Sequence, residues 1–274
     1  MSLQRRLFLN GALGAGVTFC SCGLLDAAHA QMSHKHPKAG TTRAPLMHQG
    51  QRVRTIDTHV HCYFQDALDL MGDQAKSVLP PVKGVPEHFI PVSQPAAVAE
   101  RITTMEARGV DMEVLSINPF WYRQSRDVSA AIVCLNNERL GELCAAHPKR
   151  FAAFAGLSLQ HPDLAVQELE YAVKKLGLRG IEINTHVNGK NLTDPSLGLE
   201  KFFRRVSELG VPLFIHPNGF TEASRLENHY FNNVIGNPLD TTIAVSHLIF
   251  DGVMERNPKL KVLLAHAGGY LTHY

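Results

Sequence analysis

The sequence has little excess charge, few cysteines and a shortage of long apolar runs. Its formal net charge of +2 gives no electrostatic reason to bind nucleic acid or an anionic membrane. The 274 residues are enough for one large domain with a sizeable core. We therefore expect one globular domain that binds neither nucleic acid nor an anionic membrane.

The first 30 residues resemble a twin-arginine export signal rather than part of a fold. Arg5 and Arg6 precede a glycine-rich apolar run over Gly11–Leu25, and residues 28–30 (Ala-His-Ala) form a small-x-small cleavage site. A single membrane anchor is the alternative, but the run is too short and too rich in glycine to span about 30 Å of hydrocarbon. We expect cleavage, export to the periplasm in the folded state, and no stable membrane insertion afterwards.

Cleavage would leave an odd number of cysteines. Cys62, Cys134 and Cys144 would remain, so at least one thiol is unpaired even in an oxidising compartment. Cys134 and Cys144 lie ten residues apart on one predicted helix, which disfavours a bond between them. We expect all three to be buried or free.

Short apolar runs alternate with amphipathic segments after a polar stretch over Gln31–Gln51, which we expect to be a disordered linker. The alternation predicts parallel βαβ units. The predicted strands cover residues 53–59, 110–118, 151–159, 180–184, 211–216 and 261–266, and the predicted helices cover 96–108, 128–147, 164–176, 199–209 and 241–256.

Six strand–helix units leave two α/β architectures open for the predicted domain, residues 52–274. One is an open six-stranded sheet. The other, which we favour, is a (β/α)8 TIM barrel that is truncated after its sixth strand. The segment from Cys62 to Pro95 has no clear period and carries several prolines, so we expect it to form a lid over the strand ends.

His59 and His61 are the first candidates for chemistry. Residues two apart on a strand point to the same face, roughly 6–7 Å apart, so two imidazoles can converge on one ion. With 15 histidines in the chain, chance alone supplies about one such pair. However, this pair closes a predicted strand, and catalytic groups of barrel enzymes lie at such carboxyl ends. His216 and His266 end the fifth and sixth predicted strands in the same way, so we expect a shared metal site.

Three motifs carry a resemblance to a known family. They read Asp-Thr-His-Val-His at 57–61, Phe-Ile-His-Pro at 214–217 and Leu-Ala-His-Ala-Gly-Gly at 264–269. Together with softer matches between Thr55 and Tyr274, they resemble the amidohydrolase-related family, in the branch typified by aminocarboxymuconate semialdehyde decarboxylase. The resemblance implies a TIM barrel, one divalent metal ion and an activated water, but it does not specify the substrate.

The resemblance also implies roles for individual residues. His59, His61 and His216 would bind the ion, zinc or sometimes manganese, and His266 would stay unligated and activate the water. Arg101 would pair with a substrate carboxylate, with a helix-surface salt bridge as the equal alternative. The further substrate-contact candidates are Trp121 and Tyr122, for which core packing is the alternative, and Asn184 and His186.

The sequence departs from the family pattern in two places. The family's remaining metal ligand, an aspartate at the end of the eighth strand, has no match here. The aromatic-rich stretch before Asn237 reads Asn-His-Tyr-Phe-Asn-Asn at 228–233. We expect a metal-dependent decarboxylase or hydrolase for a small carboxylated, aromatic-derived compound. An inactive fragment and a metal-binding module without catalysis are the alternatives, and a homodimer of the full-length protein stays open.

Overall fold

The computed structural model describes residues 42–75, 90–91 and 95–271. The predicted export signal lies outside these residues and stays a prediction, as do most of the predicted linker and part of the predicted lid. None of the helices in the described ranges is long and apolar enough to cross a membrane. Cys62, Cys134 and Cys144 are all free, as the sequence predicts.

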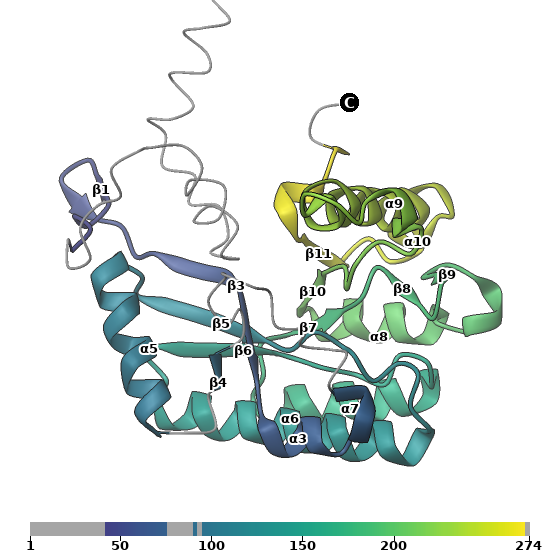
Figure 1. The fold of residues 1–274 in the computed structure, drawn as a ribbon, viewed down its shortest axis with the longest axis horizontal. Coiled ribbons are helices and arrows are strands. Elements are labelled where there is room, and N and C mark those ends of the chain that lie inside the picture. The colour runs from purple at the N-terminus through teal and green to yellow at the C-terminus, as the bar shows by residue number, and fades with distance from the viewer. Residues whose placement is uncertain (1–41, 76–89, 92–94, 272–274) are drawn as a thin grey trace, which may run out of the picture.

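A curved sheet of parallel strands organises the domain (Figure 1). The six predicted strands are all present, and their order across the sheet follows their order in the sequence. This is the arrangement of a TIM barrel, and the strands form an open half of one. From edge to edge the sheet contains β11 (Lys261–Leu264), β10 (Pro212–Ile215), β7 (Gly180–Ile183), β6 (Phe151–Ala155), β5 (Met112–Ser116), β3 (Ile56–Tyr63) and the short β4 (Ile90–Pro91).

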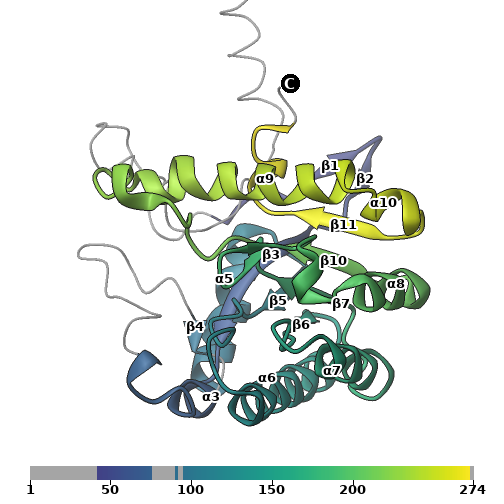
Figure 2. The same ribbon diagram turned by 90° about the vertical axis from the view of Figure 1, so that its right-hand side faces the viewer.

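The helices lie outside the curve of the sheet, and Figure 2 shows α6, α7 and α8 along its outer side. Helix α8 illustrates the cause, because Phe202, Phe203 and Val206 fall on one helical face and are buried. The predicted helix over 241–256 is two helices, since Gly252 has a positive φ of 74° and interrupts it. The helices are α5 (Pro95–Arg108), α6 (Arg126–Ala146), α7 (Pro162–Lys174), α8 (Glu200–Leu209), α9 (Asn237–Phe250) and α10 (Val253–Arg256).

Two hydrophobic clusters show which side chains face which side of the sheet. A small cluster on the concave side contains Val114, Phe154 and Phe214, whereas a large cluster between strands and helices contains Leu115. Neighbouring strand residues point to opposite faces. On β5, therefore, Val114 and Ser116 face the concave side, and Leu115 and Glu113 face the helices.

Strand β3 differs from its prediction in extent and in regularity. It runs to Tyr63, because β4 pairs with its last residues, so His59 and His61 lie within the strand rather than at its end. Its register against β5 also shifts between Asp57 and Val60. Such an irregularity changes the direction in which side chains point, and it commonly occurs beside active sites.

Two segments predicted to be irregular contain regular structure. The end of the predicted linker forms a hairpin of β1 (Met47–His48) and β2 (Gln51–Arg52), whose turn residues both have positive φ, as a type I′ turn requires. The start of the predicted lid contains α3 (Gln65–Asp69) and a 3-10 turn over Gly72–Gln74.

The described start of the predicted lid packs on the hydrophobic core and on α6. Ala67, Leu68 and Met71 belong to the outer hydrophobic core. Arg139 on α6 pairs with Asp66 at 3.2 Å. This part of the segment packs against α6 because its apolar side chains continue the interface between strands and helices, and a lid over the strand ends stays a prediction.

Candidate metal centre

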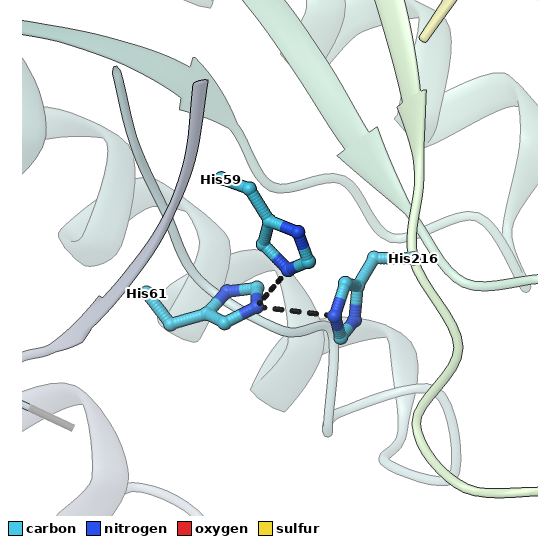
Figure 3. A group of neighbouring side chains, drawn as sticks. All are labelled: His59, His61 and His216. Atoms are coloured by element: carbon cyan, nitrogen blue, oxygen red, sulfur yellow. Dashed lines mark hydrogen bonds between the residues drawn. The ribbon is translucent and has the colours of Figure 1, made fainter. Parts of the chain in front are cut away.

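Three histidines meet on the concave side of the sheet, with their rings turned toward one another (Figure 3). His59 and His61 lie on β3, and His216 follows β10 directly. The Nε2 atom of His61 is 3.1 Å from that of His59 and 3.2 Å from that of His216. One candidate ligand atom from each residue lies within 4.8 Å of the other two. The structure thus brings together the three residues that the sequence singles out as metal ligands.

The curvature of the sheet makes this meeting possible. Strands β5, β6 and β7 separate β3 from β10 in the sheet order. The backbone N–H of His216 donates to the Ile183 carbonyl oxygen at 3.0 Å, which extends the pairing of β10 with β7 by one residue. Across the concave side, the ring of His59 on β3 packs edge-on against that of Phe214 on β10, with centroids 5.2 Å apart. The two strand ends therefore face each other across the concave side.

The three imidazoles fit a divalent cation in spacing and in protonation. Nitrogens that bind one zinc ion tetrahedrally, with bonds of about 2.0–2.1 Å, lie about 3.3 Å from one another. Burial, followed by the neighbouring histidines, holds the pKa values of His61 and His216 well below the usual range. Both rings are therefore neutral at pH 7, as a metal ligand must be.

His266 lies beside the three histidines on a strained turn after β11. Its ring centroid is 5.5 Å from that of His59 and 5.2 Å from that of His216. Burial, followed by His59, lowers its pKa to about 4. Both His266 and Ala267 have positive φ, which costs energy for residues with a side chain.

Helix α9 holds this strained turn in place. The backbone N–H of Tyr270 donates to Thr242 Oγ1 at 2.9 Å. A side chain at Gly269 would collide with the Pro238 carbonyl and with Thr242, so only glycine allows the turn to approach the helix this closely. The position of His266 is therefore fixed by the packing of its turn on α9.

A carboxylate lies behind the histidines. Glu182 on β7 is fully buried, and its Oε2 atom is 3.8 Å from His61 Nδ1. The Ser116 hydroxyl is 3.3 Å from the same nitrogen. Burial raises the pKa of Glu182 to about 7, although Ser116 and His59 act in the opposite direction. The sequence analysis missed this residue, whose signal is a glutamate inside an otherwise apolar strand.

Arg101 does not join the histidines. Its Nε atom donates to Glu113 Oε2 at 2.6 Å, and both side chains are buried between α5 and β5. Because Glu113 points to the outer face of the sheet, this ion pair lies on the opposite side from the metal centre. The placement favours the salt-bridge interpretation, with the correction that the bridge is buried rather than on the helix surface.

Trp121 and Tyr122 are buried in the large hydrophobic cluster. Trp121 is 1% exposed, its Nε1 donates to the Leu157 carbonyl oxygen at 3.0 Å, and its ring lies against Gly156 where no Cβ would fit. The Tyr122 carbonyl oxygen accepts from Asn188 at 2.7 Å. The contacts of Trp121 favour core packing over an aromatic wall around a substrate. Burial, together with Glu182 on the concave side, raises the pKa of the Tyr122 hydroxyl, so Tyr122 as a substrate contact stays a prediction.

Asn184 and His186 follow β7, and the side chains of both accept hydrogen bonds from backbone N–H groups. Asn184 Oδ1 accepts from the N–H of Asn218 at 3.1 Å, which ties the loop after β7 to the loop that carries His216. His186 Nδ1 accepts from Gly189 within the hairpin of β8 (His186–Val187) and β9 (Lys190–Asn191). As substrate contacts, both residues stay predictions.

Comparison with known proteins identifies the family. The sequence model of the amidohydrolase family matches residues 56–273. The chain belongs to this family. Amidohydrolase relatives include the 2-amino-3-carboxymuconate-6-semialdehyde decarboxylase of Dictyostelium discoideum, which is 36% identical over 62% of this chain and 47% of its own length. The gamma-resorcylate decarboxylase of Rhizobium radiobacter is 32% identical over 63% of this chain and 56% of its own length. The chain thus spans about half the length of the curated relatives that it matches.

Solved structures of other amidohydrolases share the fold. The 5-carboxyvanillate decarboxylase LigW from Sphingomonas paucimobilis superimposes with a TM-score of 0.66 at 24% identity, over 80% of this chain and 69% of its own. A 2,6-dihydroxybenzoate decarboxylase, solved in complex with 2,6-dihydroxybenzoate, superimposes with a TM-score of 0.63 at 25% identity, over 79% and 68% of the two chains. These superpositions confirm the TIM-barrel fold predicted from the sequence.

Proposed function

We propose that this amidohydrolase is a metal-dependent decarboxylase that acts on a small, aromatic-type carboxylate. The observation that carries the proposal is the convergence of His59, His61 and His216 beside the neutral His266. The decarboxylases among its relatives support the reaction type, and the relative bound to 2,6-dihydroxybenzoate supports a carboxylated ring as the substrate class.

His59, His61 and His216 would hold one divalent ion. Three neutral imidazole nitrogens suit zinc first and manganese second, because manganese prefers oxygen ligands. The bound ion would act as a Lewis acid on an oxygen of the substrate. His216 directly follows β10, and TIM barrels bind their substrates at the carboxyl ends of their strands, which supports this role.

His266 would move the proton that the reaction requires. Decarboxylation of a carboxylate breaks the bond to carbon dioxide, and a proton takes its place on the carbon. His266, whose pKa is lowered to about 4, is uncharged at pH 7, so it would take a proton from water and pass it on at once to the carbon that loses carbon dioxide. The strained turn fixes the ring beside the metal ligands, so the proton would be delivered at one place.

The proposal is tested by measuring carbon dioxide release from 2,6-dihydroxybenzoate and related carboxylates after loading with zinc or manganese. We expect release that chelation abolishes. We also expect His266→Ala to lower kcat about 10²–10⁴-fold while metal content is unchanged, which is the usual contribution of a proton-transfer group.

Each alternative function gives a different result. Hydrolysis of esters or lactones without carbon dioxide release would identify a hydrolase. Metal binding with a turnover that does not depend on His266 would contradict its catalytic role. Absence of metal binding at His59, His61 and His216 would overturn the proposal as a whole.

A further inference from the structure

We infer that Glu182 is a positioning residue of the metal centre: its buried carboxylate orients His61 and offsets part of the charge of the bound ion. The inference rests on the proposed function, because it requires an ion at the three histidines. Glu182 would not be a ligand, since it lies on the far side of the His61 ring from the other two histidines.

The burial of Glu182 needs an explanation. The residue has no exposed surface, and it lies on a strand that is otherwise apolar. Among the described residues, the ionisable partner within ion-pair distance is His61, at 3.8 Å. A buried carboxylate without a compensating positive charge is strongly unfavourable, because the protein interior solvates the charge poorly. A divalent ion held by three neutral imidazoles would supply that positive charge.

The orientation of His61 indicates how the carboxylate acts. The Nε2 atom of the ring faces His59 and His216, whereas Nδ1 faces Glu182 and the Ser116 hydroxyl. A ligand imidazole whose second nitrogen faces a carboxylate and a hydroxyl is fixed in its tautomer and in its ring orientation. Ser116 is within hydrogen-bond distance of Nδ1 and Glu182 is slightly beyond it, so Glu182 would act mainly through its charge.

The inference predicts opposite effects of one substitution on the metal-free and the metal-loaded protein. Glu182→Gln keeps the size of the side chain and removes its charge. The metal-free variant should melt at the same or a higher temperature than the parent, because the buried charge is gone. Its zinc affinity should fall about 10–100-fold, the usual cost of losing a carboxylate behind a ligand histidine. A residue with a merely structural role would not separate these two quantities.

The experiment measures the zinc dissociation constant by chelator competition and the melting temperature with and without zinc. Glu168→Gln is the matched control, because Glu168 is also a largely buried glutamate but contacts Ser158 rather than the histidines. The control should bind zinc as tightly as the parent. Glu182→Asp keeps the charge and should recover part of the affinity that Glu182→Gln loses.

Three outcomes separate this inference from the proposed function. Equal zinc affinity of the parent and Glu182→Gln overturns the inference and leaves the proposed function standing. A parent that binds no zinc or manganese overturns both. If Glu182→Gln does not fold, the visible spectrum of cobalt-loaded Glu182→Asp decides. A spectrum that differs from that of the cobalt-loaded parent supports the inference, and an identical spectrum with identical affinity overturns it.

Discussion

Two buried glutamates, one on β5 and one on β7, face opposite sides of the sheet and have different partners. Glu113 on β5 is 4% exposed and faces the helices, where Arg101 donates to it at 2.6 Å. Glu182 on β7 is fully buried and faces the concave side, where the neutral ring of His61 lies 3.8 Å away. Burial raises the pKa of both carboxyls, but Arg101 opposes this effect at Glu113 through a hydrogen bond and through its charge. The outer glutamate is neutralised within the fold, whereas the inner one is not.

The same contrast extends to other polar groups on the two faces. On the outer side, the Asn137 amide bonds both the N–H and the carbonyl of Gly156, and Glu168 accepts two hydrogen bonds from Ser158. On the concave side, the Nδ1 atoms of His216 and His266 are buried and lack a hydrogen-bond partner among the described residues. Native folds rarely leave buried polar atoms unpaired, and these two belong to histidines beside the candidate metal centre, which is consistent with a ligand there.

The largest effect that we expect is a loss of stability after removal of Arg101, the partner of Glu113. Arg101→Ala leaves Glu113 buried without its cation, which should lower the free energy of unfolding by about 3–5 kcal/mol. Urea unfolding would measure the loss. The double variant Arg101→Met, Glu113→Leu removes both charges, and it should recover most of the stability. An Arg101→Ala variant of unchanged stability but with a strongly raised KM would instead restore the predicted contact with the substrate.

The sequence predicted those parts of the site that depend on chain order alone. Parallel strands that follow one another in sequence are neighbours in the sheet, and their carboxyl ends lie on one side. His216 and His266 each follow a strand, and His59 and His61 alternate along one. Their convergence therefore needed only the curvature of a barrel, which the strand–helix repeat implies.

The parts that could not be predicted depend on which face a side chain points to. Asp57 and His59 are two residues apart, so on a regular strand they would point to the same face. Because the register of β3 shifts between Asp57 and Val60, His59 points inward while Asp57 pairs with the outward-facing Glu113. The partner of Arg101 depends on the rotation of α5 about its axis, which the spacing of apolar residues fixes only coarsely. The sequence did not indicate Glu182 as a site residue, because a glutamate in a strand ordinarily faces solvent.

A third glutamate sharpens the comparison, because its hydrogen bonds come from neutral donors rather than from a cation. The Ser158 N–H and hydroxyl donate to Glu168 at 2.6 and 2.8 Å, yet burial raises its pKa from 4.5 to about 7. Between these pH values the carboxyl is protonated in the folded chain and ionised in the unfolded chain. The favourable contribution of Glu168 is therefore complete below pH 4.5 and is lost as pH rises to about 7, by about 3 kcal/mol in total.

Glu168→Gln tests this pH dependence. The variant cannot ionise, so its stability relative to the parent should rise by up to about 3 kcal/mol as pH increases from 4.5 to 7. Urea unfolding of both proteins at several pH values measures the difference directly, and all other titrating groups cancel. Parallel stability curves for the two proteins would show that Glu168 ionises normally, and that two neutral donors compensate a buried charge as well as a cation does.

The smallest expected effect concerns Trp121, for which the sequence left two roles open, core packing and contact with the substrate. Trp121→Phe removes the hydrogen bond to the Leu157 carbonyl and some packing, so we expect a loss of about 1–2 kcal/mol in unfolding free energy. Gly156→Ala should destabilise the fold at the same place, because its Cβ would lie 2.7 Å from the indole ring. Both variants should retain the metal and the parent KM, since the ring is buried in the core against Gly156 and Leu157. A raised KM at unchanged stability would place Trp121 at the substrate instead of in the core.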